Sequence, residues 1–237
     1  MKITVLDSYE EISCSAASII TSELEKNKQL MICAATGNSP TRTYEILQQT
    51  YRSRPALFSA INIIKLDEWG GIPMDHKGTC ESYLQTHLIG PLAIDHSRYI
   101  SFFSNPENPQ VECDRIKNEL DKRGPIDICI LGLGMNGHIA LNEPADSLKP
   151  RAHVATLSAS SLTHPMISGT QQPSYGLTLG VADIFQSKMI LMLISGSKKK
   201  EVTRELLSAK ITTQFPASLL YLHSNTICLV DKDAYGN

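Results

Sequence analysis

Six short apolar runs, separated by long amphipathic stretches, constrain the fold of this chain most strongly. The runs are rich in Ile, Val and Leu without strict alternation, as in strands buried on both faces, and they lie at 2–6, 29–34, 61–66, 126–132, 188–195 and 226–230. Stretches typical of helices lie between them; the first opens on the capping-box pattern Ser8-x-x-Glu11, and others lie at about 40–53, 79–90, 108–123 and 197–209. This alternation predicts an α/β fold with a single doubly wound, mostly parallel sheet and helices on both faces.

The length and charge of the chain narrow its organisation and its partners. Its 237 residues suit one domain, 1–237. The 22 basic and 24 acidic residues are mixed and give a net charge of −2, which argues against a nucleic-acid or anionic-membrane surface. The sequence opens without a signal-peptide apolar region and has no stretch of about 18 apolar residues, so we expect a cytoplasmic protein outside the membrane.

Three further features say less about function. The segment 158–175 is polar and rich in Ser and Thr, and it is either a mobile lid or a surface excursion. The six cysteines lack C-x-x-C spacing, and we expect them to be reduced with mostly packing roles. The histidines form no H-x-x-x-H or H-E-x-x-H pattern, which gives little support to a metal site.

Polar residues follow three of the predicted strands at their carboxyl ends, where ligands collect in open parallel sheets. In the first group, 35–41, we expect Ser39 to be the N-cap of the next helix and Pro40 its first residue. Gly37 permits close backbone approach, and free N–H groups beside the hydroxyls of Thr36 and Thr41 favour a phosphate cradle. An ordinary strand–turn–helix junction is the alternative, and the Walker A pattern is absent.

Adjacent carboxylates, Asp67 and Glu68, follow the run 61–66. A strand that ends here would deliver one carboxylate into a cleft, where it can remove a carbon-bound proton. The alternative is that Asp67 caps the following turn and Glu68 is solvated. Trp69 is expected to be a packing residue, with a substrate platform as the alternative.

The third group, 131–144, places His138 and Glu143 among three glycines. Such a pair can exchange protons near neutral pH, and a structural histidine is the alternative. Its glycine spacing does not match a dinucleotide fingerprint, so NAD is not expected. After the run 188–195, one amine of the stretch 198–200, Lys-Lys-Lys, could reach a phosphate, although a charge run is usually a solvated face.

Together, the motifs ATGNSP, LDEW with a following Gly/Pro loop, GLGMNGHIALNEP and GSKK make the chain resemble the glucosamine-6-phosphate deaminase family, which is related in fold to 6-phosphogluconolactonase. The resemblance covers nearly the whole chain. The segments KLDEW, GTCESYL, LGLGMNGH and PASLLYLHSNTICL look closest to the branch called galactosamine-6-phosphate isomerase or deaminase.

The resemblance implies a catalytic set and a phosphate-binding set. Asp67 would be the base that moves a proton between C2 and C1 of the open-chain sugar. His138 would assist ring opening, and Glu143 would orient and tune His138. The residues implied to hold the substrate phosphate are Thr36, Gly37, Asn38, Ser39, Thr41 and Lys199.

Two positions depart from the family pattern. Asn136 stands where deaminases usually carry Asp; an Asn can accept a hydrogen bond from imidazole but lacks the charge that stabilises a protonated ring. The family's phosphate arginine aligns with Ile167 or nearby, so phosphate binding would lean on backbone amides and Lys199, with Arg42 or Arg151 as candidates. The chain also ends soon after its last run, without the extension of deaminases that form allosteric hexamers, so we expect no such activation. Whether it forms a homo-oligomer stays open.

The implied function is that of an amino-sugar phosphate isomerase/deaminase that needs no metal or redox cofactor. It would convert a hexosamine 6-phosphate, with galactosamine 6-phosphate preferred, to the ketose 6-phosphate and ammonia by ring opening and C2-to-C1 proton transfer. Glucosamine-6-phosphate deaminase is the nearest alternative. A 6-phosphogluconolactonase is disfavoured because that branch typically has an apolar residue where Glu143 stands, and a non-catalytic sugar-phosphate-binding module is a further alternative.

Overall fold

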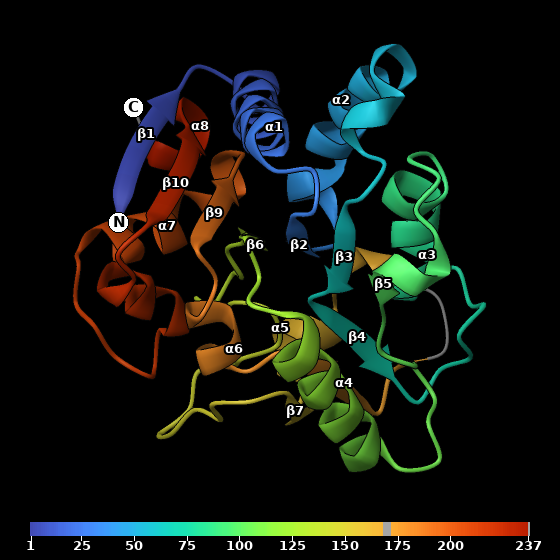
Figure 1. Ribbon diagram of the computed structural model, residues 1–237. Coiled ribbons are helices and arrows are strands. Elements are labelled where there is room, and N and C mark those ends of the chain that lie inside the picture. The colour runs from blue at the N-terminus through green and yellow to red at the C-terminus, as the bar shows by residue number, and fades with distance from the viewer. Residues whose placement is uncertain (168–171, 237) are drawn as a thin grey trace.

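The computed structural model describes residues 1–167 and 172–236 of the chain (Figure 1). Within this part, seven parallel strands form the main sheet in the order β1-β10-β9-β6-β2-β3-β5. Each predicted apolar run coincides with one of these strands to within two residues, which confirms the mostly parallel sheet. The short strand β5 was not predicted. The strands are β1 (Lys2–Leu6), β2 (Met31–Ala34), β3 (Asn62–Lys65), β5 (Tyr99–Ile100), β6 (Ile128–Gly132), β9 (Met189–Ile194) and β10 (Thr226–Asp231).

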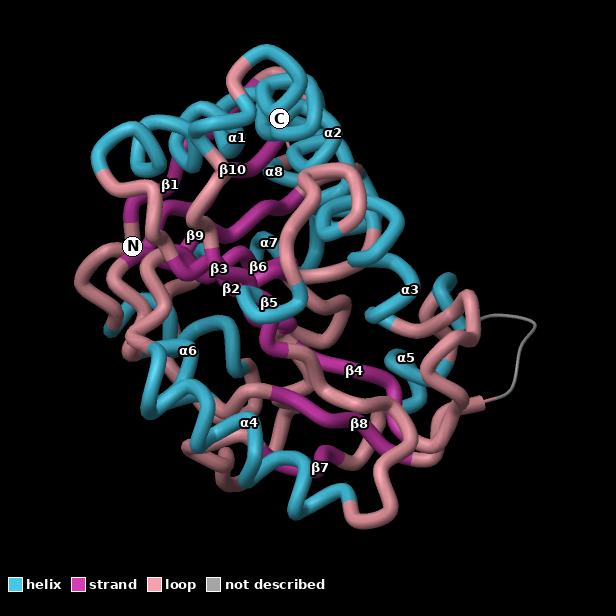
Figure 2. Tube along the Cα trace, turned by 45° about the vertical axis from the view of Figure 1, so that its right-hand side comes forward, coloured by secondary structure: helices cyan, strands magenta, loops and turns pink. Residues whose placement is uncertain are grey.

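Helices cover both faces of the main sheet. Figure 2 shows α1 and α2 on one side and α4 and α6 on the other. The apolar core between these layers includes Cys33, Cys129 and Cys228, all buried, so these cysteines pack as predicted. The helices are α1 (Tyr9–Lys26), α2 (Asn38–Ser53), α3 (Cys80–Leu84) with the π-helical turn Gln85–Ile89, α4 (Pro109–Arg123), α5 (Ala159–Leu162), α6 (Val181–Phe185), α7 (Lys200–Leu207) and α8 (Lys232–Tyr235).

Helix α2 begins earlier than the sequence predicted. Its N-cap is Gly37 rather than Ser39, and Pro40 is the third helical residue. Gly37 has φ of 91°, a left-handed conformation that glycine adopts without steric cost, so the chain enters the helix two residues sooner. Pro40 is tolerated because the N–H groups of the first turn have no intrahelical acceptor in any case.

A second, antiparallel sheet was not anticipated. It contains β4 (Asp67–Gly70), β8 (Tyr175–Thr178) and β7 (His153–Ala155), in the order β4-β8-β7. The chain passes from one sheet to the other at Leu66, whose N–H donates to Ala34 in the main sheet and whose carbonyl accepts from Leu179 beside the small one. Asp67 therefore lies where the two sheets meet.

The segment 158–175 forms part of a wall beside the small sheet. Its described portion contains α5 and a helical turn at Pro165–Ile167, while residues 168–171 of the predicted lid lie outside the described residues. Ile167 is fully buried with Trp69, Ile72 and Leu141 in a small apolar cluster, which confirms the packing role of Trp69. A lid at 158–175 stays a prediction.

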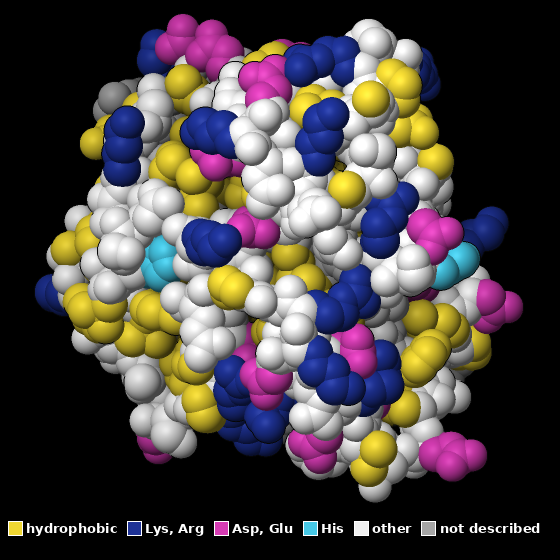
Figure 3. All heavy atoms as spheres, in the orientation of Figure 1, with side chains coloured by type: hydrophobic (Ala, Val, Ile, Leu, Met, Phe, Trp, Pro, Cys, Tyr) yellow, Lys and Arg dark blue, Asp and Glu magenta, His cyan; other side chains and the backbone are white. Residues whose placement is uncertain are grey.

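The distribution of surface charge and the character of the helices can be compared with the expectation of no nucleic-acid or membrane partner. Basic and acidic side chains are interspersed over the face in Figure 3, in keeping with the net charge of −2. In the described ranges, no helix is long and apolar enough to cross a bilayer.

Candidate active site

The carboxyl ends of β2, β3, β6 and β9 surround a cavity of about 590 Å³. Parallel strands place their carboxyl ends at one edge of the sheet, so segments distant in sequence meet there. Most of the predicted site residues line this cavity: Thr36, Gly37, Asn38, Ser39, Asp67, His138 and Lys199. The other three, Thr41, Asn136 and Glu143, do not line it.

The turn at the start of α2 forms one wall of the cavity. The first N–H groups of this helix have no intrahelical acceptor and carry the positive end of the helix dipole, so they suit an anion. Thr41 lies behind the turn, where its hydroxyl donates to the Gly37 carbonyl at 2.9 Å and contacts the Tyr83 hydroxyl at 2.7 Å. Tyr83 donates to the same carbonyl at 2.9 Å. Thr41 thus holds the turn in place and does not line the cavity as a phosphate ligand would.

The side chain of Asp67 reaches the cavity from the junction of the two sheets. Burial and the neighbouring Glu68 carboxylate raise its pKa to about 7, although His138 and Cys80 act in the opposite direction. The Cys80 thiol donates to Asp67 Oδ1 at 3.7 Å and accepts from the Thr36 hydroxyl at 3.3 Å. No backbone N–H of the described residues donates to the Asp67 carboxylate, so the capping alternative finds no support here.

Glu68 is fully buried, so the alternative in which it is solvated is wrong. Its carboxylate accepts from the backbone N–H groups of Cys80 and Glu81 at the start of α3, both at 2.8 Å. It also pairs at 2.7 Å with the buried Lys65, which contacts Glu81 at 2.9 Å. Burial opposes the charge on Lys65, yet the two carboxylates hold its pKa above the ordinary value. This ion cluster fastens α3 to β4 and so fixes Cys80 beside Asp67.

A glycine-rich loop after β6 positions His138. A methyl group on Gly134 would lie 2.4 Å from the His138 ring, so only glycine leaves room for this ring position. Gly137 has φ of 83°, which permits the tight turn before His138. His138 Nδ1 lies 3.4 Å from Glu143 Oε2, longer than an ordinary hydrogen bond.

Asn136 contacts Glu143 rather than the imidazole. Its amide nitrogen donates to Glu143 Oε2 at 2.8 Å, and its amide oxygen accepts from the backbone N–H of His138 at 3.3 Å. The hydrogen bond that an Asn can accept from imidazole does not occur among the contacts of the described residues. Asn136 therefore acts on His138 through Glu143 and the backbone.

Serines from the wall at 158–167 complete the surroundings of Glu143. The hydroxyls of Ser158, at 3.0 Å, and Ser161 both donate to Glu143 Oε1. Burial opposes ionisation, but the contact with His138 and the hydrogen bonds from Ser161 and Asn136 lower the pKa of Glu143 to about 2. Sequence reasoning missed these serines and Cys80, because nothing in their local pattern distinguishes them from ordinary helix-cap and packing residues.

Of the two lysines in the GSKK motif, Lys199 is the less exposed, and it lines the cavity. It follows Gly196, whose φ of 89° turns the chain after β9, and its amine donates to the Leu133 carbonyl. Burial lowers the pKa of Lys199. Lys198 also lines the cavity, so this part of the charge run is not merely a solvated face.

Neither arginine suggested for phosphate binding lines the cavity. Arg42 pairs with Glu10 at 2.7 Å and Glu45 at 3.0 Å. Arg151 pairs with Asp121 and with Asp183. Both guanidinium groups are therefore engaged elsewhere, and the prediction that one of them helps Lys199 is wrong.

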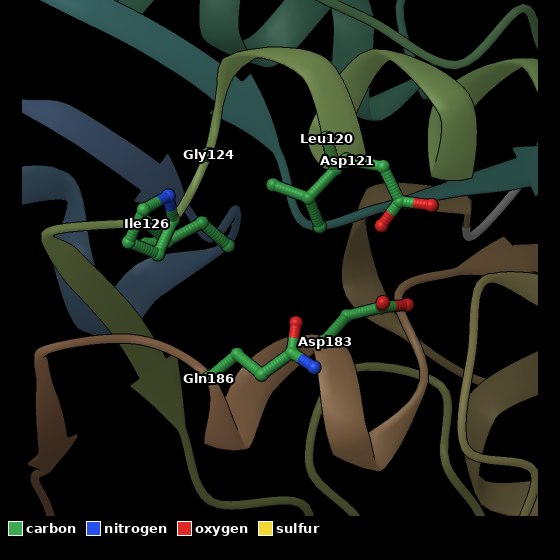
Figure 4. Close-up of a pocket in the computed structure, with 7 residues that line it drawn as sticks. Leu120, Asp121, Gly124, Ile126, Asp183 and Gln186 are labelled. Carbon is green, nitrogen blue, oxygen red and sulfur yellow. The ribbon is translucent and has the colours of Figure 1, made fainter.

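A smaller cavity of about 260 Å³ lies away from this site, between α4 and α6 (Figure 4). It is lined in part by Asp121, Asp183 and Gln186, and Arg151 pairs with both carboxylates. None of the predicted site residues lies there. In the part of the chain that the structure describes, no group of three or more His, Cys, Asp or Glu side chains could hold a metal ion.

The chain is similar to known proteins over nearly its whole length. Residues 8–229 match the family model described as glucosamine-6-phosphate isomerases/6-phosphogluconolactonase. The chain is 38% identical to the AgaI protein of Escherichia coli (strain K12), over 95% of this chain and 90% of that protein. It is 35% identical to glucosamine-6-phosphate deaminase 1 of Bacillus subtilis (strain 168), over 99% and 98% of the two chains.

A solved structure of a monomeric glucosamine-6-phosphate deaminase superposes with a TM-score of 0.93 at 35% identity, covering 99% of this chain and 98% of that one. The 6-phosphogluconolactonase of Leishmania guyanensis superposes with a TM-score of 0.80 at 18% identity, over 100% and 98%, which shows the shared fold alone. On the strength of the matched family model and these relatives, the chain belongs to the family of glucosamine-6-phosphate isomerases and 6-phosphogluconolactonases.

Proposed function

We propose that this enzyme converts a hexosamine 6-phosphate to the corresponding ketose 6-phosphate and ammonia, with galactosamine 6-phosphate as the preferred substrate. The observation that carries the proposal is the carboxyl group of Asp67, whose pKa of about 7 suits a base at neutral pH. It lines one cavity with His138 and with the turn and the lysine suited to a phosphate. The 6-phosphate group would anchor the sugar, and the reacting carbons would face Asp67.

The reaction follows from the proposed roles. The substrate phosphate lies on the Gly37 turn and Lys199. His138, oriented by Glu143, moves the proton between the ring oxygen and the anomeric hydroxyl as the ring opens. Asp67 removes the proton from C2, which gives an enolamine, and returns it to C1, which gives a ketimine at C2. Water then hydrolyses the ketimine, so the C2–N bond breaks and ammonia leaves.

The ionised Glu143 supports the role of His138. With a pKa of about 2, Glu143 is charged throughout the neutral range, so its carboxylate can orient the His138 ring that lies 3.4 Å away. Asn136 and two serines fix this carboxylate, so its orientation does not depend on the bound sugar. This arrangement favours proton transfer over the alternative of a non-catalytic binding module, which needs no such acid–base pair.

The galacto preference rests on the segments KLDEW, GTCESYL and PASLLYLHSNTICL, which resemble the galactosamine-6-phosphate branch. Glucosamine 6-phosphate, the substrate named for the Bacillus subtilis relative, is the second candidate. We place the reaction in the cytoplasm because a phosphorylated sugar carries charge that a bilayer excludes.

The test is ammonia release from galactosamine 6-phosphate and glucosamine 6-phosphate, measured side by side, with hydrolysis of 6-phosphogluconolactone as a third assay. We expect ammonia from both amino sugars, with a higher kcat/KM for the galacto epimer. Faster release from the gluco epimer would reverse the preference and leave the reaction class standing. Lactone hydrolysis without ammonia release would overturn the proposal.

A further inference from the structure

His164 faces the Gly37 turn, which we propose binds the substrate phosphate, from the opposite wall of the cavity. It comes from the wall at 158–167 and lines the same cavity as Lys199. A methyl group built on Gly37 would lie 3.7 Å from both Cε1 and Nε2 of the His164 ring, so this edge of the ring points at the turn. The other side of the ring packs on Trp69, with 5.7 Å between ring centroids.

The hydrogen bonding of His164 indicates which nitrogen carries the proton. Nδ1 accepts from the backbone N–H of Met166 at 3.3 Å. A neutral imidazole that accepts at Nδ1 carries its proton on Nε2. The donor therefore lies on the edge that faces Gly37, where an anion on the turn would be within reach.

The Lys199 amine lines the same cavity as His164 and favours an anion there, whereas the Asp67 carboxyl group, which also lines the cavity, does not. The His138 ring reaches this cavity from the loop after β6. Burial lowers the pKa of His164, and His138 and Lys199 lower it further, so the ring is neutral at neutral pH in the free protein. A dianion between these groups would reverse that effect, because it stabilises the imidazolium form.

We propose that His164 is a direct ligand of the substrate's phosphate group and donates to it from Nε2. When the phosphate binds, the ring gains a proton at Nδ1 and gives up the hydrogen bond from the Met166 N–H. The inference rests on the proposed function in that the substrate carries a phosphate at the Gly37 turn. The inference adds His164 to the phosphate site, as a residue that becomes positively charged only when an anion is bound. The segment that contains His164 also holds Glu143 through Ser161, so phosphate binding and the orientation of the acid–base pair share one wall.

Sulfate is a suitable probe because it keeps two charges across the neutral range and takes up no proton itself. Sulfate binding is measured by calorimetry in buffers of different ionisation enthalpy, which gives the protons taken up by the protein. The variants are His164→Phe, which keeps a ring against Trp69 but has no donor, and His164→Gln, which keeps a donor but cannot become charged. His96→Gln, an exposed histidine outside the cavity, is the control.

We expect His164→Phe to weaken sulfate binding and to raise KM for the sugar phosphate by about 10–100-fold, as for a lost charge-assisted hydrogen bond. Proton uptake on sulfate binding should fall in both His164 variants and stay unchanged in His96→Gln. At pH 8, His164→Gln should bind sulfate more tightly than His164→Phe but less tightly than the wild type. At pH 6 its affinity should fall further behind that of the wild type, whose ring is more readily charged there.

Trp69 supplies an independent readout, since it is the single tryptophan of the chain. An imidazolium beside an indole quenches its fluorescence, so the pH midpoint of quenching reports the charge on His164. Sulfate should move this midpoint to higher pH in the wild type, and His164→Phe should abolish the transition.

Unchanged sulfate affinity and proton uptake in His164→Phe would overturn the inference, as would a wild-type protein that binds no sulfate. If sulfate binding behaves as expected but no amino-sugar phosphate releases ammonia, the ligand role stands and the proposed function fails. If ammonia is released normally and His164→Phe leaves both KM and sulfate binding unaffected, the function stands and the ligand role fails.

Discussion

Replacement of Asp67 by asparagine tests its role in proton transfer while preserving the shape of the side chain and the backbone pairing of residue 67. The amide has nearly the shape of the acid, and the pairing of residue 67 with Thr178 in the small sheet runs through the backbone. A positioned base typically contributes about 10²–10⁴-fold, so kcat should fall by that factor. KM should change little, since the groups suited to the phosphate lie elsewhere in the cavity.

Asp67→Asn should lower activity but raise the stability of the folded protein near pH 8. Because the folded-state pKa of Asp67 is about 7 and the ordinary value is 3.8, its carboxyl group stabilises the fold below about pH 4 and loses that contribution as the pH rises through 7. The gap between the two pKa values corresponds to at most about 4 kcal/mol. Asparagine resembles the protonated form, so Asp67→Asn should be the more stable protein near pH 8, and the difference should vanish near pH 4.

The assays are ammonia release, exchange of the C2 proton into deuterated water, and chemical denaturation at several pH values. Asp75→Asn, at an exposed aspartate on the loop after β4, is the matched control and should leave all three unchanged. Near-wild-type turnover and exchange in Asp67→Asn would refute the proton-transfer role. Loss of activity together with loss of stability near pH 8 would instead indicate that the carboxylate supports the local fold.

Three further substitutions test the supporting residues. Lys199→Ala should raise KM for the sugar phosphate by about tenfold or more with a smaller effect on unphosphorylated sugars, and an unchanged KM would count against this phosphate contact. Cys80→Ala removes a hydrogen bond that lowers the pKa of Asp67, so the acidic limb of the kcat/KM profile should move to higher pH; a shift to lower pH would contradict that reasoning. Gly134→Ala should displace the His138 ring and lower kcat while circular dichroism stays native, and full activity would show that the ring has room elsewhere.

The sequence by itself determined the main sheet and the edge where the site lies. The predicted strands other than the edge strand β1 are mostly buried, so their apolar character is local and visible without any partner. The turn at Gly37, the carboxylate Asp67 and the loop around His138 each follow such a strand directly. Their meeting in one cavity followed from the rule that parallel strands align their carboxyl ends.

The tertiary structure alone decided the small sheet and the groups around the predicted acid–base residues. Strand β4 exists because Asp67–Gly70 pairs with Tyr175–Thr178, more than a hundred residues later, and no local pattern encodes that pairing. The buried cluster of Lys65, Glu68 and Glu81 likewise looks like ordinary surface charge in the sequence, since a charged residue is buried only when its partners arrive from other elements.

The contacts of Cys80 with Asp67 and of Ser161 with Glu143 also join residues of different segments, 13 and 18 positions apart in the chain. A helix cap or a small buried thiol has the same local signature whether it lies beside a catalytic carboxylate or far from one. Local patterning therefore gives the strands and the residues that follow them, while long-range packing sets which side chains surround each acid and base and hence their protonation at neutral pH.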